Sequence, residues 1–223
     1  MDWSPILISM RAAGLSIVFT FFMGILAAWM VVRISHPLVK TILDGIFTIP
    51  LVLPPTVAGF FLLYVFGVKR PVGQFFMEYF SVKIAFSWGA TVLAAVVMSF
   101  PLMYRSARGA FEQVDDTLVQ AARTLGMGEW PIFRKVLLAN AVPGVVSGGV
   151  LAFARGLGEF GATAMIAGNI AGKTRTLPMA VYSEVAAGNM EAAYSYVAII
   201  VVIAFLSVFL MNGAMWYSQK KSR

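Results

Sequence analysis

The chain has 223 residues, of which 60% are hydrophobic and only 12% are charged, and its formal net charge is +7. Because about a quarter of the residues in soluble domains are charged, this composition excludes an ordinary soluble domain and indicates an integral membrane protein. The chain contains no cysteine, which excludes disulfides and thiolate metal sites.

Five uncharged stretches are each long enough to cross a hydrocarbon core, which takes about 18 residues or more. They are Ala12–Val32, Gly45–Val68, Ile84–Tyr104, Val136–Ala154 and Ala192–Gln219. Between the last two, Phe160–Gly172 either prolongs the fourth span or leads to a short re-entrant or surface helix at Pro178–Ala187. A sixth crossing is the less favoured alternative. The sequence therefore predicts an all-α membrane protein with about five transmembrane helices, in one domain over residues 1–223.

Lys and Arg are unequally divided between the two sets of loops. With the N-terminus outside, the inner side collects ten of them: Arg33, Lys40, Arg105, Arg108, Arg123, Arg134, Lys135, Lys220, Lys221 and Arg223. The outer side then has only five: Lys69, Arg70, Lys83, Lys173 and Arg175. The positive-inside rule therefore predicts an external N-terminus, a cytoplasmic C-terminus and a cytoplasmic loop at 106–135. This topology explains most of the net charge, so nucleic acid is not expected as a partner.

The second span contains an unusual concentration of proline. Pro50, Pro54 and Pro55 lie within six residues, and each interior proline removes a backbone hydrogen bond, so the helix must break or bend near mid-membrane. Carbonyls freed by the break cannot face lipid, and must bond other protein groups or line a wet cavity. Two interpretations are open: a structural kink packed against another helix, or part of a substrate route that includes Pro54, Pro55 and Thr56.

The polar segment Asp115–Lys135 is predicted to form two helices joined by a glycine turn. Asp115 and Asp116 place acceptors and negative charge where a helix begins, and Gly126 ends that helix. A second helix is predicted to start at Glu129. The first helix should present one apolar face that docks on something, made of residues spaced by three and four: Leu118, Ala121, Ala122 and Leu125.

Two charged residues lie in the fourth apolar region. Arg155 and Glu159 are spaced i and i+4, near enough to neutralise one another. A charge at membrane depth costs at least about 2.5 kcal/mol on insertion scales, so neither side chain should face lipid. A buried structural ion pair is the first interpretation, and a gate or an anion-facing role is the second.

The sequence shows no catalytic or metal-binding pattern. Gly168–Thr174 resembles a phosphate-binding loop, but only three residues separate Gly168 from Gly172, where the pattern needs four. The single histidine, His36, has no nearby set of metal ligands. We therefore expect no catalytic residue, no metal and no cofactor in this chain.

The order Gln120-Ala121-Ala122, with Gly126 four residues after Ala122 and an apolar run reaching Pro143, resembles the EAA loop of permease subunits of bacterial ABC importers. In that family the loop forms a coupling helix that sits in a cleft of a separate ATPase subunit. Gln120 stands where the family usually has Glu. The residues that the resemblance assigns to ATPase coupling are Gln120, Ala121, Ala122, Arg123, Leu125, Gly126 and Glu129.

Three other segments resemble molybdate permeases, so the resemblance extends over nearly the whole chain. They are the proline-rich run after Ile49, the helix Phe153–Thr163 and the run Gly172–Pro178. The resemblance implies the type I (MetI-like) permease fold and a multi-pass protein of the bacterial inner membrane. It implies a homodimer that binds cytoplasmic ABC ATPase subunits and an external oxyanion-binding protein, either periplasmic or a lipoprotein.

The function implied by this resemblance is that of a non-enzymatic transmembrane subunit of an ATP-driven importer. The subunit would form the pathway for molybdate, with tungstate alongside, and ATP would be used only by the partner. The first alternative is a sulfate or thiosulfate permease, which shares the proline-rich second span. The second is an anion transporter that works without an ATPase, which would usually show an internal repeat or intramembrane titratable groups for ion coupling.

Overall fold

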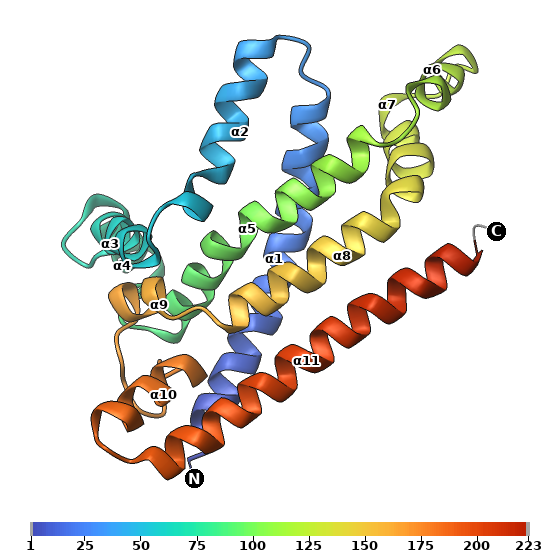
Figure 1. Ribbon diagram of the computed structural model, residues 1–223. Coiled ribbons are helices and arrows are strands. Elements are labelled where there is room, and N and C mark those ends of the chain that lie inside the picture. Colours follow the sequence, from blue (N-terminus) through green and yellow to red (C-terminus); the bar gives the residue numbers. More distant parts are fainter. Residues whose placement is uncertain (1, 222–223) are drawn as a thin grey trace.

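The computed structural model of the chain describes residues 2–221, with side chains at all of these positions except 211 and 214–221. Every regular element in this part is helical, which confirms the predicted all-α class (Figure 1). The elements are α1 (Ser4–Val32), α2 (Pro37–Val52), α3 (Pro55–Phe66), α4 (Pro71–Phe80), α5 (Trp88–Glu112), α6 (Asp116–Thr124), α7 (Glu129–Ile132), a π-helical turn (Phe133–Leu137), α8 (Leu138–Leu157), α9 (Gly161–Ile166), α10 (Leu177–Ala186) and α11 (Met190–Lys221).

The centre of the fold is formed by α1, α5 and α8, which pack along one another, while α11 runs beside α8 and α10 (Figure 1). Small residues allow the close approach of these helices. A Cβ atom on Gly24 of α1 would lie 2.6 Å from Met103 Cγ of α5, and one on Gly148 of α8 would lie 2.5 Å from Ser106 Cβ. The three helices therefore form one tightly packed unit on which the other elements are mounted.

Four helical segments are long and apolar enough to cross a membrane: Ser4–Val32, Trp88–Glu112, Glu129–Leu157 and Met190–Leu210. The pair α2 and α3 makes a fifth candidate if its two parts are taken as one bent span. The predicted number of about five spans is confirmed. In the described part of the chain, the region between α8 and α11 contains only the short helices α9 and α10 and gives no sixth candidate.

Several helices extend further than the uncharged stretches that predicted them, and the first begins at Ser4 rather than Ala12. The third, expected at Ile84–Tyr104, begins at Trp88 because the Ser87 hydroxyl accepts the Ala90 N–H (3.3 Å), and it runs on to Glu112. Residues 106–112 of the expected cytoplasmic loop are thus part of α5. The fourth helical segment begins at Glu129 rather than near Val136, because α7, the π-helical turn and α8 are continuous.

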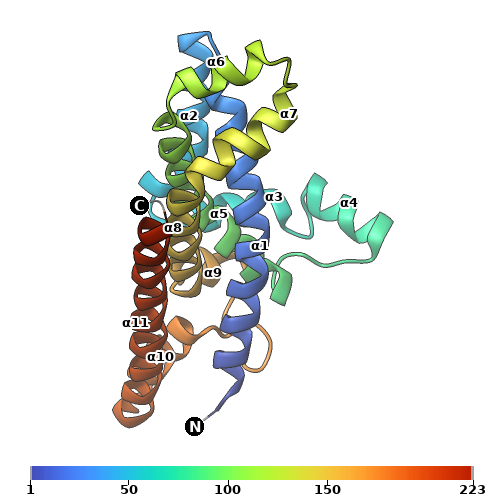
Figure 2. The same cartoon turned by 90° about the vertical axis from the view of Figure 1, so that its right-hand side faces the viewer.

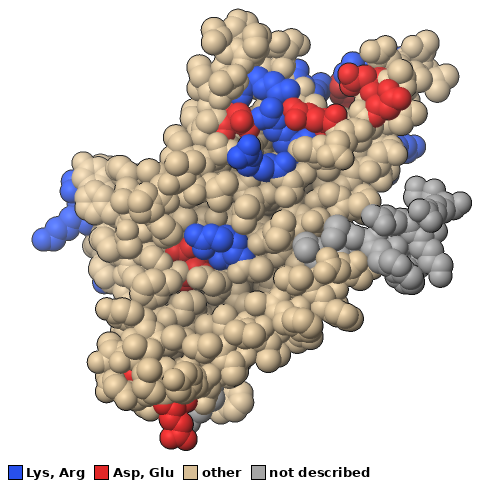
Figure 3. Space-filling view, in the orientation of Figure 1, with Lys and Arg blue, Asp and Glu red and all other residues tan. Residues whose placement is uncertain are grey.

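The two ends of the bundle carry different elements. The end of α1, the start of α2 and all of α6 lie at one end, and α10 lies near the N-terminus at the other (Figures 1 and 2). Lys, Arg, Asp and Glu gather at the α6 end on the face shown in Figure 3. The predicted inner cations of the C-terminus lie outside the described side chains: Lys220, Lys221 and Arg223. The direction of the bundle in the membrane stays a prediction.

Candidate coupling and pathway sites

The predicted first helix of the polar segment is present as α6, with the expected cap at each end. At its start, an Asp115 carboxylate oxygen accepts the Thr117 N–H at 2.9 Å, a bond that lowers the pKa of Asp115 below its ordinary value. At its end, Gly126 has a φ of +75°, in the left-handed region that favours glycine. The Met127 N–H reaches back to the Ala122 carbonyl at 3.1 Å, so the helix is closed off.

An ion-pair bridge ties α6 to the next helix. Arg123 Nε donates to Glu129 Oε1 at 3.0 Å, and this partner raises the pKa of Arg123. Glu129 Oε2 lies 3.3 Å from Arg33 Nη2, where α1 ends. Because one carboxylate contacts two cations from different elements, Glu129 links α6, α7 and α1 at the turn. The sequence does not predict this arrangement, because it identifies Arg33 only as one of the cations on the inner side.

A group of aromatic rings anchors the second half of the segment to the bundle. Trp29 of α1 lies 4.7 Å from Phe133 and 6.0 Å from Trp130, measured between ring centroids. Phe133, in the π-helical turn, also contacts Phe111 of α5 at 6.0 Å. Burial of aromatic rings is a strong source of packing energy, so α7 and the π-helical turn are held firmly by α1 and α5.

Only part of the apolar face predicted for α6 packs on this chain. Ala122 is 5% exposed and Val119 is half-buried, so these two positions face the bundle. Leu118 and Leu125 are 48% and 81% exposed, and Ala121 is exposed beside them. The other predicted coupling residues are also at the surface, apart from Glu129, which is half-buried: Gln120, Arg123 and Gly126. The helix therefore keeps an uncovered apolar edge, which we define as Leu118, Ala121 and Leu125.

A polar groove lies directly beside α6. It has a volume of about 610 Å³ and runs between α5 and α8. Its lining includes Arg105, Asn140, and Asp115 and Leu118 of the α6 segment. Since α6 forms part of its wall, any displacement of α6 changes the shape of this groove.

The proline-rich break is also confirmed. The axes of α2 and α3 differ by 110°, and Leu53 and Pro54 between them have extended backbone conformations. Beyond the break, α3 packs closely on α9, since a Cβ atom on Gly59 would lie 2.6 Å from the Ala162 Cα. Pro54, Pro55 and Thr56 are exposed in the single chain. The bend therefore places α3 across the bundle rather than along it (Figures 1 and 2).

Arg155 and Glu159 form the ion pair that their spacing predicted. Arg155 Nη1 lies 2.5 Å from Glu159 Oε2, and the other carboxylate oxygen accepts the Ala162 N–H at 2.8 Å. The Glu159 side chain is 2% exposed, whereas that of Arg155 is 28% exposed. On the face in Figure 3, a blue and a red patch lie together near the junction of α8 and α9, with tan surface immediately around them.

The two predicted pathway sets are close in space. Gly161, at the start of α9, lies against the break, since its Cβ would be 2.8 Å from Pro55 Cβ and 3.1 Å from the Thr56 nitrogen. Glu159 is two positions before Gly161, and its carboxylate accepts the N–H of Ala162, the residue after Gly161. The ion pair and the broken span therefore meet at one junction, which we call the break junction and define as Pro54, Pro55, Thr56, Arg155 and Glu159.

Glu159→Ala is expected to lower the melting temperature of the detergent-purified protein more than Glu159→Gln does. Gln keeps an oxygen for the Ala162 N–H and a neutral partner for Arg155, whereas Ala removes both acceptors. An unsatisfied buried polar group costs about 1–3 kcal/mol, so the two variants should be clearly separated in thermal unfolding. Equal melting temperatures would show that the Glu159 hydrogen bonds do not hold the break junction.

The segment that resembles a phosphate-binding loop is a closed turn. Thr174 Oγ1 accepts the Ile170 N–H at 3.0 Å and donates to the Gly168 carbonyl at 3.2 Å, and the Thr174 side chain is fully buried. The hydroxyl is thus occupied inside the turn. The residues that the structure describes contain no group of three or more His, Cys, Asp or Glu side chains that would hold a metal ion.

Sequence comparison matches residues 20–223 to the family described as binding-protein-dependent transport system inner membrane component. A relative from Escherichia coli strain K12, the molybdenum transport system permease protein ModB, is 43% identical, covering 99% of this chain and 96% of its own. The sulfate transport system permease protein CysT of Salmonella typhimurium is 33% identical, covering 92% of this chain and 73% of its own.

Structural comparison finds the same fold in a solved ABC importer. A chain of the MetNI methionine ABC transporter superimposes with a TM-score of 0.75, covering 97% of each chain at 18% identity. At this identity the likeness shows the fold alone, and it confirms the predicted MetI-like fold.

Proposed function

Because the chain belongs to the family of binding-protein-dependent transport system inner membrane components, we propose that it is the membrane subunit of an ATP-driven importer whose cargo is molybdate. The chain is a non-catalytic, multi-pass permease of the inner membrane, and its family implies ATPase and binding-protein partners. Molybdate as the cargo is supported by the 43% identity to a molybdenum permease over nearly the full length of both chains.

The observation that carries the mechanism is the uncovered apolar edge of α6. Leu125 is 81% exposed on a capped helix, although the neighbouring turn is braced by ion pairs and aromatic packing. A rigid element that leaves large apolar side chains uncovered is typical of a docking site for another protein. We propose that the ATPase subunit covers this edge, and that Gln120, Arg123, Gly126 and Glu129 shape or border the contact.

A homodimer is part of the same proposal. Two copies would face each other around one pathway, with each α6 on one ATPase subunit, the N-terminus outside and the coupling segment 106–135 in the cytoplasm. The break junction would line the pathway, because it joins an interrupted span to a charged pair that is only partly covered. An external binding protein would deliver the oxyanion, tungstate included. The chain itself would bind no cofactor, and ATP would be consumed by the partner.

Reconstituted uptake tests the cargo. Proteoliposomes that contain this chain, its ATPase and its binding protein are expected to accumulate molybdate only when ATP is enclosed on the ATPase side. An equal concentration of sulfate should leave the molybdate rate unchanged. Full competition by sulfate would favour the alternative suggested by the 33% identity to a sulfate permease. Molybdate uptake by the chain without its ATPase would overturn the proposal and favour an ATPase-independent transporter.

A further inference from the structure

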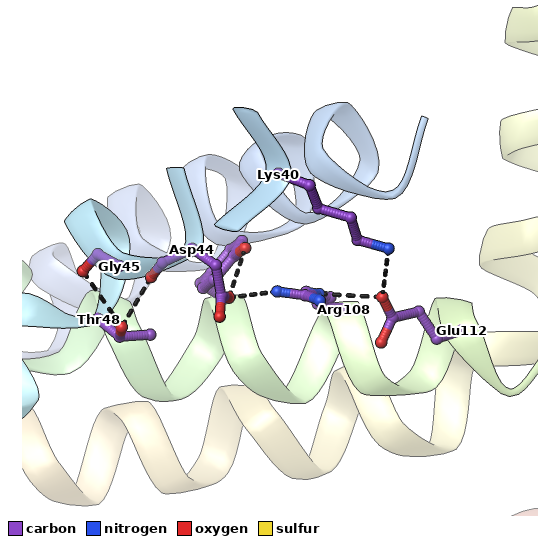
Figure 4. A network of polar contacts seen from close by, with 7 residues as sticks. Lys40, Asp44, Gly45, Thr48, Arg108 and Glu112 are labelled. Carbon is purple, nitrogen blue, oxygen red and sulfur yellow. Dashed lines mark hydrogen bonds and ion pairs between the residues drawn. The ribbon is translucent and has the colours of Figure 1, made fainter. Parts of the chain in front are cut away.

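A network of charged side chains joins α2 to α5 near the end of the bundle that carries α6 (Figure 4). Lys40 and Asp44 come from α2, and Tyr104, Arg108 and Glu112 come from α5. Arg108 contacts Asp44 and also donates from Nε to Glu112 Oε1 at 3.0 Å. Lys40 Nζ lies 2.9 Å from Glu112 Oε1, and the Tyr104 hydroxyl donates to Asp44 Oδ1 at 3.0 Å. We call these five residues the charge clamp.

The clamp is neutral and partly shielded from solvent. It contains two cations and two carboxylates arranged as a chain, in which Arg108 and Glu112 each contact two partners of opposite charge. The Arg108 side chain is 20% exposed and that of Asp44 is 32% exposed. Isolated ion pairs at the surface contribute little, but half-buried charges held in a network are less screened and fix geometry more strongly. The clamp therefore has the features of a mechanical connection between two helices.

Little else holds α2 in place. None of the residues of α2 is buried, so this helix has no packed core of its own. Apart from the clamp, Leu43 and Phe47 pack on the core cluster that includes α5, and the Phe47 ring lies 5.2 Å from that of Tyr104 and 5.6 Å from that of Phe100. A movement of α5 would pass to α2 mainly through the clamp and the adjacent Leu43 and Phe47 side chains.

The clamp lies between the coupling helix and the break junction. Glu112 is the last residue of α5, and α6 begins at Asp116, so a displacement of α6 acts directly on the clamped end of α5. On the other side, α2 leads through the proline break into α3, which packs on α9. We propose that the charge clamp transmits the movement of α6 to α2 and so to the break junction, with Asp44 and Arg108 as positioning residues. This inference rests on the proposed function.

The test measures the number of ATP molecules hydrolysed per molybdate imported by the reconstituted transporter. Asp44→Asn and Arg108→Gln are each expected to raise this ratio about tenfold while ATP hydrolysis continues. The double variant should be no worse than the single ones, because both substitutions remove the same contact. A purely structural role would lower the melting temperature of the complex and leave the ratio unchanged, and that result would overturn the inference.

Arg105 provides a matched control for the loss of charge. It lies one turn before Arg108 on α5 and borders the same small cavity as Asp44, Arg108 and Glu112, but it is exposed, and among the described residues no hydrogen bond or ion pair joins it to the clamp. Arg105→Gln is therefore expected to keep the wild-type ratio. An equal rise in this variant would show that positive charge on α5, rather than the link to α2, sets the ratio, and would also overturn the inference.

A covalent link can replace the clamp, because the chain has no native cysteine. In a Lys40→Cys, Glu112→Cys variant, the ratio should rise as in the neutralised variants. A bifunctional thiol reagent that joins the two positions, removable by reductant, should restore the ratio, and reduction should raise it again. Failure of the link to restore coupling would contradict a holding role for the clamp. A wild-type complex that imports no molybdate with ATP would instead overturn the proposed function, and the inference with it.

Discussion

Gly126→Pro is expected to leave at most about one tenth of the wild-type rate of ATP-driven molybdate uptake. Gly126 has a φ of +75°, whereas proline fixes φ near −65°. Proline would also remove the N–H that Gly126 donates to the Arg123 carbonyl at 2.9 Å. The turn after α6 would therefore open, and Arg123 would separate from Glu129, so that α6 no longer moves as one body with the bundle. Uptake into proteoliposomes with the ATPase present measures the loss.

The same turn contains the control for this prediction. Gly128 has an ordinary φ of −69°, and a Cβ atom there would lie 3.8 Å from Pro131 Cδ, so Gly128→Ala should transport at nearly the wild-type rate. Leu125→Asp separates docking from folding, because the side chain is 81% exposed and its change leaves the packing of this chain intact. The ATPase should no longer co-purify with Leu125→Asp. Normal transport by inserted Gly126→Pro and Leu125→Asp proteins would refute the coupling role of α6.

The bounds of α6 were predictable because the signals for them are local. Asp115 caps the helix through a bond to a residue two positions away, and Gly126 ends it through its own backbone conformation. The face that packs on the bundle was not predictable in the same way. Val119 and Ala122 face the protein and Leu118 does not. The rotation of α6 about its own axis is set by contacts with the π-helical turn and α7, which the periodicity of the α6 sequence does not encode.

The charge clamp is not predictable from the sequence, for a physical reason. In a membrane protein, Lys40 and Arg108 near the ends of apolar stretches are explained by the positive-inside rule alone, and no partner is needed for them. The carboxylates do carry a local signal, since Lys40 and Asp44 are spaced i, i+4, as are Arg108 and Glu112. Each helix thus carries an alternating pair of charges, and the structure joins the two pairs across the helix interface.

The proline break shows the same division between local and distant causes. Pro50, Pro54 and Pro55 forbid a continuous helix, so a break was predictable from backbone chemistry alone. The angle of 110° was not, because the direction of α3 after the break is fixed by its packing on α9. That packing depends on glycines which carry no side-chain pattern, and which appear significant only when Gly59 is seen against Ala162.

Gly59→Ala is expected to lower both the melting temperature and the molybdate uptake of the transporter, with uptake falling about tenfold or more. The added Cβ would lie 2.6 Å from the Ala162 Cα and 2.8 Å from the Ala162 carbonyl oxygen. Real Cβ atoms do not approach backbone atoms so closely, and overpacking of this kind costs about 1–3 kcal/mol. Because the backbone of α9 cannot move aside as a flexible side chain does, α3 must shift. The shift would displace the break junction.

The control for Gly59 is another glycine on the same bent span. A Cβ atom on Gly45 in α2 would have no neighbour within 4 Å. Gly45→Ala should therefore keep the wild-type melting temperature and uptake, or gain slightly in helix stability. Gly161→Ala would disturb the junction from the α9 side, because its Cβ would lie 2.8 Å from Pro55 Cβ. Its melting temperature and molybdate uptake should fall as in Gly59→Ala. If both junction variants transport normally while Gly45→Ala does too, the position of α3 on α9 is not part of the pathway. If uptake falls in both variants with little change in melting temperature, the junction acts on transport itself, because the fold is then kept while molybdate uptake is lost.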